Sequence, residues 1–432
     1  MAASIHIYCS MSFFRFLVIF LSIVLSGSSL SFAQDTLQRV EAGRSNSKQQ
    51  QGKPYVILIS ADGFRYDFST KYQATFLQSR KKLGVTAPSM IPSFPSLTFP
   101  NHYTLVTGLY PAHHGLVDNT FQDRETGGWY SMSDRNAVKE GKWYGGTPLW
   151  VLAEQQKMVS ASFYWVGSEA DIKGLRPTYW YPYNEKIGID DRIGAVVKWL
   201  KLPEDKRPHL ITFYLPEVDH AGHDFGPDSK EVQEAVAFVD NAVKKLNEAV
   251  NATGLSVNFI FVSDHGLTKV NNANPLKVSA VPSDSSRYTV SGNGTMVDVF
   301  VKDRKQLNSV YRELKGSASR YSVYTKYNTP ARWHYSAKDD AQGRIADILL
   351  EARWPEYFSD RKVVKPGAHG YDPYKVKEMH ATFIAWGPAF KEGLVLPSFE
   401  NVHIYPLVAD ILRLRSTEKI DGRLKVLKPA LR

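Results

Sequence analysis

The chain has 432 residues, enough for one large α/β domain or two smaller ones. Hydrophobic residues make up 43% of it and aromatic residues 12%, a composition that excludes a largely disordered chain. The formal charge is +10, but no run of Lys and Arg is dense enough to predict a nucleic-acid-binding arm, so we expect no specific binding to a nucleic-acid duplex.

The N-terminal segment has the pattern of a secretory signal peptide. Arg15 precedes an apolar stretch at 16–25, and the small residues that follow predict cleavage at Ala33-Gln34. We therefore expect residues 1–33 to be a signal peptide and the protein to be exported, either periplasmic or secreted. The apolar stretch is shorter than the roughly 20 residues of a membrane span, so we expect no stable span. An uncleaved anchor and a start at Met11 stay as alternatives.

The only cysteine, Cys9, lies inside this removable segment, so the exported chain would contain no disulfide bond. Exported proteins of animals and plants usually contain disulfides, and a cysteine-free exported domain therefore favours a bacterial envelope. Residues 34–53 are polar and rich in Gln and Ser, which predicts a flexible linker. We expect a short C-terminal tail at 413–432.

From residue 54 onward the pattern is that of an α/β domain. Four apolar runs predict strands buried in a sheet: 55–60, 210–214, 258–262 and 381–385. Residues 232–250 have apolar side chains at three- and four-residue spacing, which indicates a helix. Strands that alternate with helices predict a mostly parallel central sheet with helices on both faces. We place this domain at 54–412, with an inserted cap or subdomain at about 270–366 that shapes the substrate pocket.

Carboxylates and histidines follow three of these predicted strands. Asp62 follows the first, Asp219 the second and Asp264-His265 the third. Because the carboxyl ends of parallel strands open into one crevice, we expect these groups to lie close together. Asp219 and His223 are four residues apart, so one helical turn would present both to the same ion. Together with His369, these groups could hold two Zn²⁺ ions, and paired metals suit phosphoryl transfer.

A hydroxyl group stands at the start of a predicted helix. Pro100 suits a first helical turn, which places Thr98 at the helix N-terminus, where an anionic phosphate or an alkoxide is stabilised. Ser96 is the competing hydroxyl, and a Thr or Ser here also serves as an ordinary helix cap. We expect the remaining histidines of interest to be structural, exposed or behind the ligands rather than ligands: His102, His113, His114, His209 and His380.

Taken together, these motifs resemble the nucleotide pyrophosphatase/phosphodiesterase family of the alkaline phosphatase superfamily. The matching segments, which keep the family's order from about residue 54 to 412, are 60–65, 93–103, 106–111, 113–115, 219–223, 263–266 and 369–372. The family's usual Trp-Pro-Gly-Ser-Glu appears here as Trp165-Val166-Gly167-Ser168-Glu169, without the proline. The resemblance implies an alkaline phosphatase-like α/β fold.

The resemblance also implies a site with two Zn²⁺ ions and Thr98 as the nucleophile. One ion would be held by Asp62, Thr98, Asp264 and His265, and the other by Asp219, His223 and His369. Such ligand sets tolerate other divalent ions, so Mn²⁺, Fe or Mg²⁺ could replace zinc.

Further residues would bind the substrate. Asn119 would donate to a non-bridging phosphate oxygen, and Phe99 would lie beside a nucleobase. The opposite aromatic wall would come from 179–183, with Tyr183 as the first choice and Trp180 as the second.

The resemblance finally implies a hydrolase, a phosphodiesterase I or nucleotide diphosphatase that acts on small nucleotides without an obligate protein partner. It would form a covalent phosphothreonine and release nucleoside 5′-monophosphates. The alternatives are an enzyme for lysophospholipid or choline-type diesters, a phosphomonoesterase of the same superfamily, and a non-enzymatic carbohydrate- or metal-binding envelope protein that keeps a degenerate phosphatase fold.

Overall fold

The computed structural model describes residues 36–416 and 418–432. The predicted signal peptide lies outside these residues. Within them, every helix is too short or too polar to cross a lipid bilayer.

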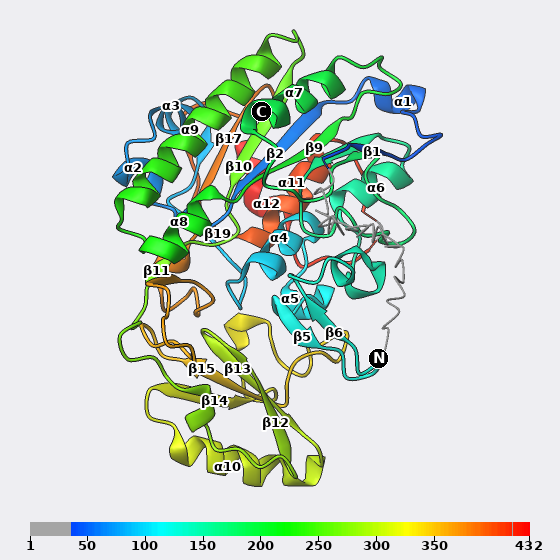
Figure 1. The fold of residues 1–432 in the computed structure, drawn as a ribbon. Coiled ribbons are helices and arrows are strands. Elements are labelled where there is room, and N and C mark those ends of the chain that lie inside the picture. The colour runs from blue at the N-terminus through cyan, green and yellow to red at the C-terminus, as the bar shows by residue number, and fades with distance from the viewer. Residues whose placement is uncertain (1–35, 417) are drawn as a thin grey trace, which may run out of the picture. The chain divides into compact units, whose positions relative to one another are not determined.

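A nine-stranded sheet forms the centre of the described chain (Figure 1). In spatial order its strands are β1 (Arg39–Val40), β8 (Tyr179–Trp180), β7 (Ser160–Phe163), β9 (Leu210–Leu215), β2 (Tyr55–Ala61), β10 (Val257–Val262), β17 (Phe383–Trp386), β3 (Val85–Thr86) and β18 (Leu394–Val395). The run from β8 to β10 is parallel, whereas β1 and β17 are antiparallel to their neighbours. The predicted α/β fold with a mostly parallel sheet is confirmed, and all four predicted strands belong to this sheet.

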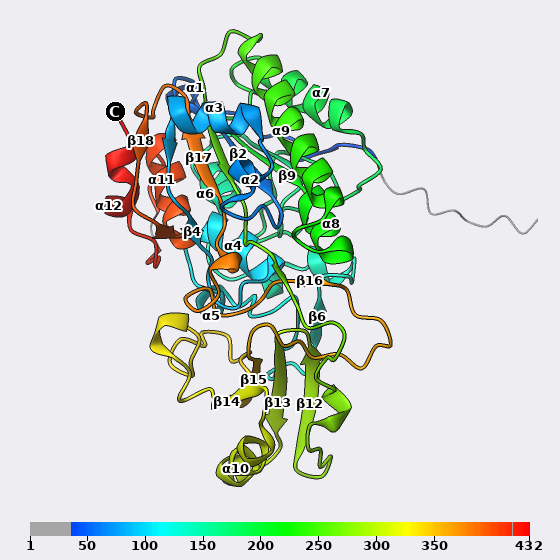
Figure 2. The same cartoon turned by 90° about the vertical axis from the view of Figure 1, so that its left-hand side faces the viewer.

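Successive side chains of β2 enter two different hydrophobic cores, as expected for a strand covered on both faces. Val56 and Leu58 belong to one core, and Ile57 and Ile59 to the other; all four are fully buried. Helices of the first core are α4 (Thr98–Thr107), α6 (Leu149–Gln155) and α11 (Ile404–Ile411). Helices of the second are α3 (Thr75–Leu83), α7 (Ile189–Leu200) and α9 (Lys230–Asn251). Figure 2 shows α7 and α9 on one side of the sheet and α11 on the other.

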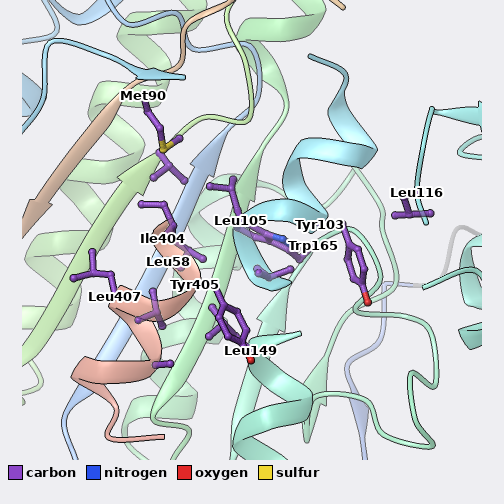
Figure 3. Packing of buried hydrophobic residues seen from close by; sticks show 14 of the residues in the cluster. Leu58, Met90, Tyr103, Leu105, Leu116, Leu149, Trp165, Ile404, Tyr405 and Leu407 are labelled. Carbon is purple, nitrogen blue, oxygen red and sulfur yellow. The ribbon is translucent and has the colours of Figure 1, made fainter. Parts of the chain in front are cut away.

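The first core anchors α4, the helix on which Thr98 stands. Leu105 of α4, Leu58 of β2, and Ile404 and Leu407 of α11 all belong to this core (Figure 3). Burying side chains of this size stabilises the fold by roughly 1.5–3 kcal/mol each. The helix α4 is therefore anchored against the central strands by the packing of its C-terminal half.

A second sheet, antiparallel and four-stranded, stands apart from the first in Figure 1. Its order is β12 (Tyr288–Asn293), β13 (Met296–Val301), β15 (Ile348–Ala352) and β14 (Tyr321–Thr325). The helix α10 (Leu307–Ser317) shares a separate hydrophobic core with this sheet. We call β12–β15 and α10 the inserted sheet. It lies within the range expected for the cap; its role over a substrate stays a prediction.

The segment expected to be a flexible linker contains two short regular elements. The strand β1 pairs with β8, and α1 (Lys48–Gln51) follows it. Asn46 donates from Nδ2 to the carbonyl oxygens of Glu204 and Arg207, at 2.8 and 2.7 Å. Composition did not indicate these elements, because their contacts are backbone pairing and single amide hydrogen bonds to distant parts of the chain rather than apolar burial.

Candidate metal centre

Four predicted residues meet at the carboxyl ends of β2 and β10 and at the start of α4. We call them the inner half of the centre: Asp62, Thr98, Asp264 and His265. Nε2 of His265 lies 2.9 Å from Oδ2 of Asp264, 3.6 Å from Oδ1 of Asp62 and 3.2 Å from Oγ1 of Thr98. The two carboxylates and the imidazole are at most 2% exposed. The two central strands thus bring residues about 200 positions apart into contact, as the convergence argument predicts.

Three more predicted residues form the outer half: Asp219, His223 and His369. The first two lie one turn apart on α8 (Glu217–Phe225), which begins just after β9, and the third follows β16 (Gly367–Ala368). Both imidazole Nε2 atoms face Oδ1 of Asp219, at 3.5 Å from His223 and 3.7 Å from His369. The rings of His369 and His265 stack with centroids 3.6 Å apart, so the two halves are adjacent.

The hydrogen bonds of the three histidines fix which nitrogen faces the centre. Nδ1 of His223, His265 and His369 lies 2.9 Å from a backbone carbonyl oxygen in each case. Because a carbonyl oxygen only accepts, Nδ1 carries the hydrogen and Nε2 offers a lone pair. Nε2 of His223 and Nε2 of His369 are 3.1 Å apart, and two lone pairs at that distance repel unless a cation lies between them. Metal-binding histidines have this arrangement.

The carboxylates also fit a cation. One buried oxygen of each has no hydrogen-bond donor: Oδ1 of Asp62, Oδ1 of Asp219 and Oδ2 of Asp264. Burial, followed by the charges of Asp264 and Asp219, raises the pKa of Asp62 well above its usual value. Buried carboxylates are costly unless they are paired or bind a metal. The side chains form overlapping groups with ligand atoms within 4.8 Å of one another, so they could bind metal ions of the kind that accept carboxylate and imidazole ligands.

His102 lies directly behind the inner half, one of the placements expected for it. Its Nδ1 is 3.2 Å from Oδ2 of Asp264 and 3.0 Å from the carbonyl oxygen of Thr98, and the ring is fully buried. With Asp62 and Asp264 it forms a third group whose ligand atoms lie close together. Its position four residues after Thr98, on the same face of α4, was the available indication. His102 therefore lies behind the inner half and faces one of its carboxylates.

Tyr214, near the end of β9, is a residue that the sequence did not single out. Its hydroxyl donates to Oδ2 of Asp62 at 2.6 Å. That bond orients the carboxylate so that Oδ1 faces His265.

A cavity of about 230 Å³ opens beside Asp62 and Thr98. Phe99 and Tyr183 both line it, as expected for an aromatic pocket. Trp180 does not: it lies in β8 and donates from Nε1 to Glu41 Oε1 at 3.1 Å. In an extended segment, positions three apart point to opposite sides, so only one of the two candidate aromatics reaches the cavity.

The polar wall of the cavity comes from residues that the sequence analysis did not assign. Glu169 accepts from Nη2 of Arg135, with both oxygens at 2.7 and 2.8 Å, and from the backbone N–H of Tyr183 at 3.0 Å. Glu169 ends the segment in which Val166 replaces the family's proline, and this segment still lines the cavity.

Asn119 lies beside the start of α4. Its Oδ1 accepts from the backbone N–H of Phe99 at 2.9 Å. Because a backbone N–H can only donate, this bond assigns the oxygen and leaves Nδ2 as the donating end of the amide.

Comparison with known proteins gives one consistent family. The family model for type I phosphodiesterase/nucleotide pyrophosphatase matches residues 56–372. An uncharacterized pyrophosphatase/phosphodiesterase of Schizosaccharomyces pombe is 36% identical over 379 residues, which cover 83% of this chain and 77% of that protein. Human ectonucleotide pyrophosphatase/phosphodiesterase family member 1 is 33% identical over 84% of this chain, which spans 40% of that longer protein. Venom phosphodiesterase 2 of Crotalus adamanteus is 32% identical over 83% of this chain and 45% of its own length.

Solved structures agree with the sequence relatives. Murine ectonucleotide pyrophosphatase/phosphodiesterase 5 has a TM-score of 0.81 and 30% identity, over 88% of this chain and 100% of the other. An inactive threonine-to-alanine variant of that murine protein, in complex with AMP, has a TM-score of 0.81 and 29% identity over the same shares of the two chains.

Proposed function

The chain belongs to the type I phosphodiesterase/nucleotide pyrophosphatase family of hydrolases, and we propose that it is a two-zinc enzyme that cleaves phosphodiester or pyrophosphate bonds in small nucleotides. The proposed products are nucleoside 5′-monophosphates. The observation that carries this proposal is the convergence of the inner half and the outer half beside one aromatic cavity. The AMP in the murine relative is a nucleoside 5′-monophosphate, which agrees with the proposed product class.

Thr98 is the proposed nucleophile. Its Oγ1 lies at the N-terminus of α4, where the helix dipole stabilises negative charge, and 3.2 Å from Nε2 of His265. In this role the threonine oxygen bonds to phosphorus, the bond to the leaving oxygen breaks, and water later hydrolyses the phosphothreonine ester. Bound zinc ions would supply Lewis acidity, which favours the ionised threonine and neutralises charge on the reacting oxygens. In the relative, the inactivating change is also at a threonine.

The proposed substrate contacts follow from the cavity. Nδ2 of Asn119, whose oxygen is held by Phe99, would donate to a non-bridging phosphate oxygen as negative charge develops there. Phe99 and Tyr183 would bind a planar base between them, and stacking of this kind stabilises a complex by about 0.5–1.5 kcal/mol beyond apolar burial. Aromatic walls also bind a quaternary ammonium group, so the choline-type diester stays the alternative that the substrate panel below has to separate from a nucleotide.

We also propose that the protein is exported after cleavage near Ala33. The support is the N-terminal sequence pattern together with the relatives, whose names describe ectonucleotide and venom enzymes. N-terminal sequencing of the mature protein from its own host tests this: a first residue at Gln34 is expected, and retention of Arg15 would contradict it.

A substrate panel on metal-analysed protein tests the activity. We expect the nitrophenyl ester of a nucleoside 5′-monophosphate to be cleaved fastest, ahead of nitrophenyl phosphorylcholine and nitrophenyl phosphate. Dominant cleavage of the choline ester would indicate a lipid-type substrate, and dominant cleavage of the phosphate monoester would indicate a phosphatase.

The variant Thr98→Ala tests the nucleophile. Turnover should fall by at least about 10³-fold while zinc content stays near that of the wild type, because the other ligands remain. The control is Thr120→Ala, which removes an exposed hydroxyl one residue after Asn119 and should leave turnover unchanged. Near-normal activity of Thr98→Ala would mean that another group attacks phosphorus.

A further inference from the structure

Ser96 is bonded to three consecutive residues of the segment that carries His369. Its Oγ donates to the carbonyl oxygen of Tyr371 at 2.7 Å and accepts from the backbone N–H of Gly370 at 3.1 Å. Its own carbonyl oxygen accepts from Nδ1 of His369 at 2.9 Å. The residue is fully buried, so all three bonds are shielded from water.

These bonds explain how an isolated loop histidine is aimed at the centre. The bond from Nδ1 to the Ser96 carbonyl sets the tautomer and the ring plane of His369, so that its Nε2 lone pair faces Asp219. The two hydroxyl bonds hold the backbone of 370–371 at a fixed distance from that same carbonyl. The Ser96 hydroxyl therefore keeps the Ser96 carbonyl oxygen and the His369 ring in a fixed relative position.

Thr295, the residue that precedes β13, also lies close to this segment. Gly370 has φ +111°, and a Cβ atom there would lie 2.3 Å from Oγ1 of Thr295 and 3.0 Å from Cδ2 of Leu97. Only glycine adopts this backbone conformation without strain. Thr295 and Leu97, the residue after Ser96, thus leave no room for a side chain at position 370.

Ser96 is also two residues before Thr98, at the end of the loop that leads into α4. Its hydroxyl makes two hydrogen bonds and has no exposed surface, so it is not free to attack a phosphate. The loop that positions the proposed nucleophile is therefore the same loop that orients a ligand of the outer half.

We propose that Ser96 is a positioning residue: it aligns His369 for metal binding and couples the outer half to Thr98. This inference rests on the proposed two-metal function. Without the hydroxyl, the N–H of Gly370 and the carbonyl of Tyr371 each lose a partner in a dry environment, and the segment relaxes. Nε2 of His369 is then no longer held toward Oδ1 of Asp219.

The test compares Ser96→Ala with Ser93→Ala. Ser93 lies in the same loop, is 5% exposed and donates from Oγ to Oδ1 of Asn401 at 2.8 Å, so its loss removes one buried hydrogen bond that does not involve His369. Zinc affinity is measured by competition with a chromogenic chelator, and kcat and KM with the nitrophenyl nucleotide ester. In Ser96→Ala we expect one of two zinc ions to bind about 10- to 100-fold more weakly, the usual effect of losing a group that orients a ligand.

Three further readouts separate positioning from a general loss of stability. At limiting zinc, kcat of Ser96→Ala should fall with KM within about twofold, and excess zinc should restore part of the rate, because only occupancy of one half has changed. Ser96→Thr, which keeps a hydroxyl, should restore the affinity. Ser93→Ala should bind both ions like the wild type.

The outcomes distinguish this inference from the proposed function. If Ser96→Ala binds both ions as tightly as Ser93→Ala, the positioning role is overturned and the proposed function stands. If the wild type binds no zinc, the proposed function fails and the inference with it. Should Ser96→Ala not fold, Ser96→Cys keeps the volume but is a weak donor, and normal zinc affinity in that variant would equally overturn the role.

Discussion

The inner and outer halves of the centre present the same kinds of atoms but are built on different supports. The inner half stands at the ends of β2 and β10, which pair over six residues in the middle of the main sheet, and its carboxylates and imidazole are at most 2% exposed. The outer half stands on the nine-residue helix α8 and after the two-residue strand β16. Its side chains are 6–26% exposed.

This difference shows two ways to fix a metal ligand. Strands buried on both faces hold the inner ligands through the packing of the whole domain. The outer ligands depend on a small number of local contacts: the carbonyl of Gly367 for His223, and Ser96 for His369. We therefore expect metal binding by the inner half to be insensitive to substitutions at distant residues. Metal binding by the outer half should change when a single hydrogen bond to one of its ligands is lost.

The largest expected effect is in the inner half, in Asp62→Asn. Turnover should fall by about 10³-fold or more, because an anionic ligand beside the nucleophile is lost. The zinc-free variant should nevertheless unfold at a higher temperature than the zinc-free wild type, because burial and the charges of Asp264 and Asp219 oppose an ionised Asp62. Calorimetry of both proteins, with and without zinc, measures the unfolding temperatures that are compared.

The control for this prediction is Asp171→Asn, whose carboxylate is 54% exposed. It should change neither turnover nor the stability of the zinc-free protein. If zinc-free Asp62→Asn is no more stable than the zinc-free wild type, the three carboxylates do not repel one another strongly. Their charges would then give no reason for a cation at this place.

A smaller effect concerns the order in which metal leaves. A chelator should remove the ion of the outer half first, at least about tenfold faster than that of the inner half, because its ligands are more exposed and are held by local contacts. Zinc release followed by chelator absorbance should show two phases, with activity lost in the first. His223→Gln should remove the fast phase and Asp264→Asn the slow one. A single phase would contradict the distinction between the halves.

Much of the inner half could be predicted because each indication lies within one short, continuous stretch of sequence. The apolar runs that end in Asp62 and in Asp264-His265 predict buried strands, and parallel strands bring their ends together. The i,i+4 spacing of Asp219 and His223 predicted their shared face in the same way. These inferences use periodicity and need no knowledge of distant contacts.

The parts that could not be predicted depend on single contacts across the fold. Tyr214 bonds to Asp62 from the neighbouring strand, yet it has no distinctive spacing relative to its partner. The pairing of β1 with β8 joins segments about 140 residues apart. Ser96 is a competing nucleophile in the sequence because its position two residues before Thr98 gives no indication that its hydroxyl is already bonded.

The smallest expected effect tests a surface contact of the outer half, the ion pair between Lys365 and Asp224. Nζ and Oδ1 are 2.6 Å apart, and the pair links α8 to the residues before β16, but the side chains are 60% and 47% exposed. Exposed ion pairs contribute little to stability and are screened by salt. Lys365→Met should therefore change the release rate of the outer ion by at most about twofold. In 0.5 M salt, where the Debye length is roughly 4 Å, the variant should show no measurable change. Chelator kinetics at two salt concentrations provide the measurement, with Ser96→Ala as the reference for a buried contact. A tenfold acceleration in Lys365→Met would mean that surface charge holds α8 as firmly as buried hydrogen bonds hold His369.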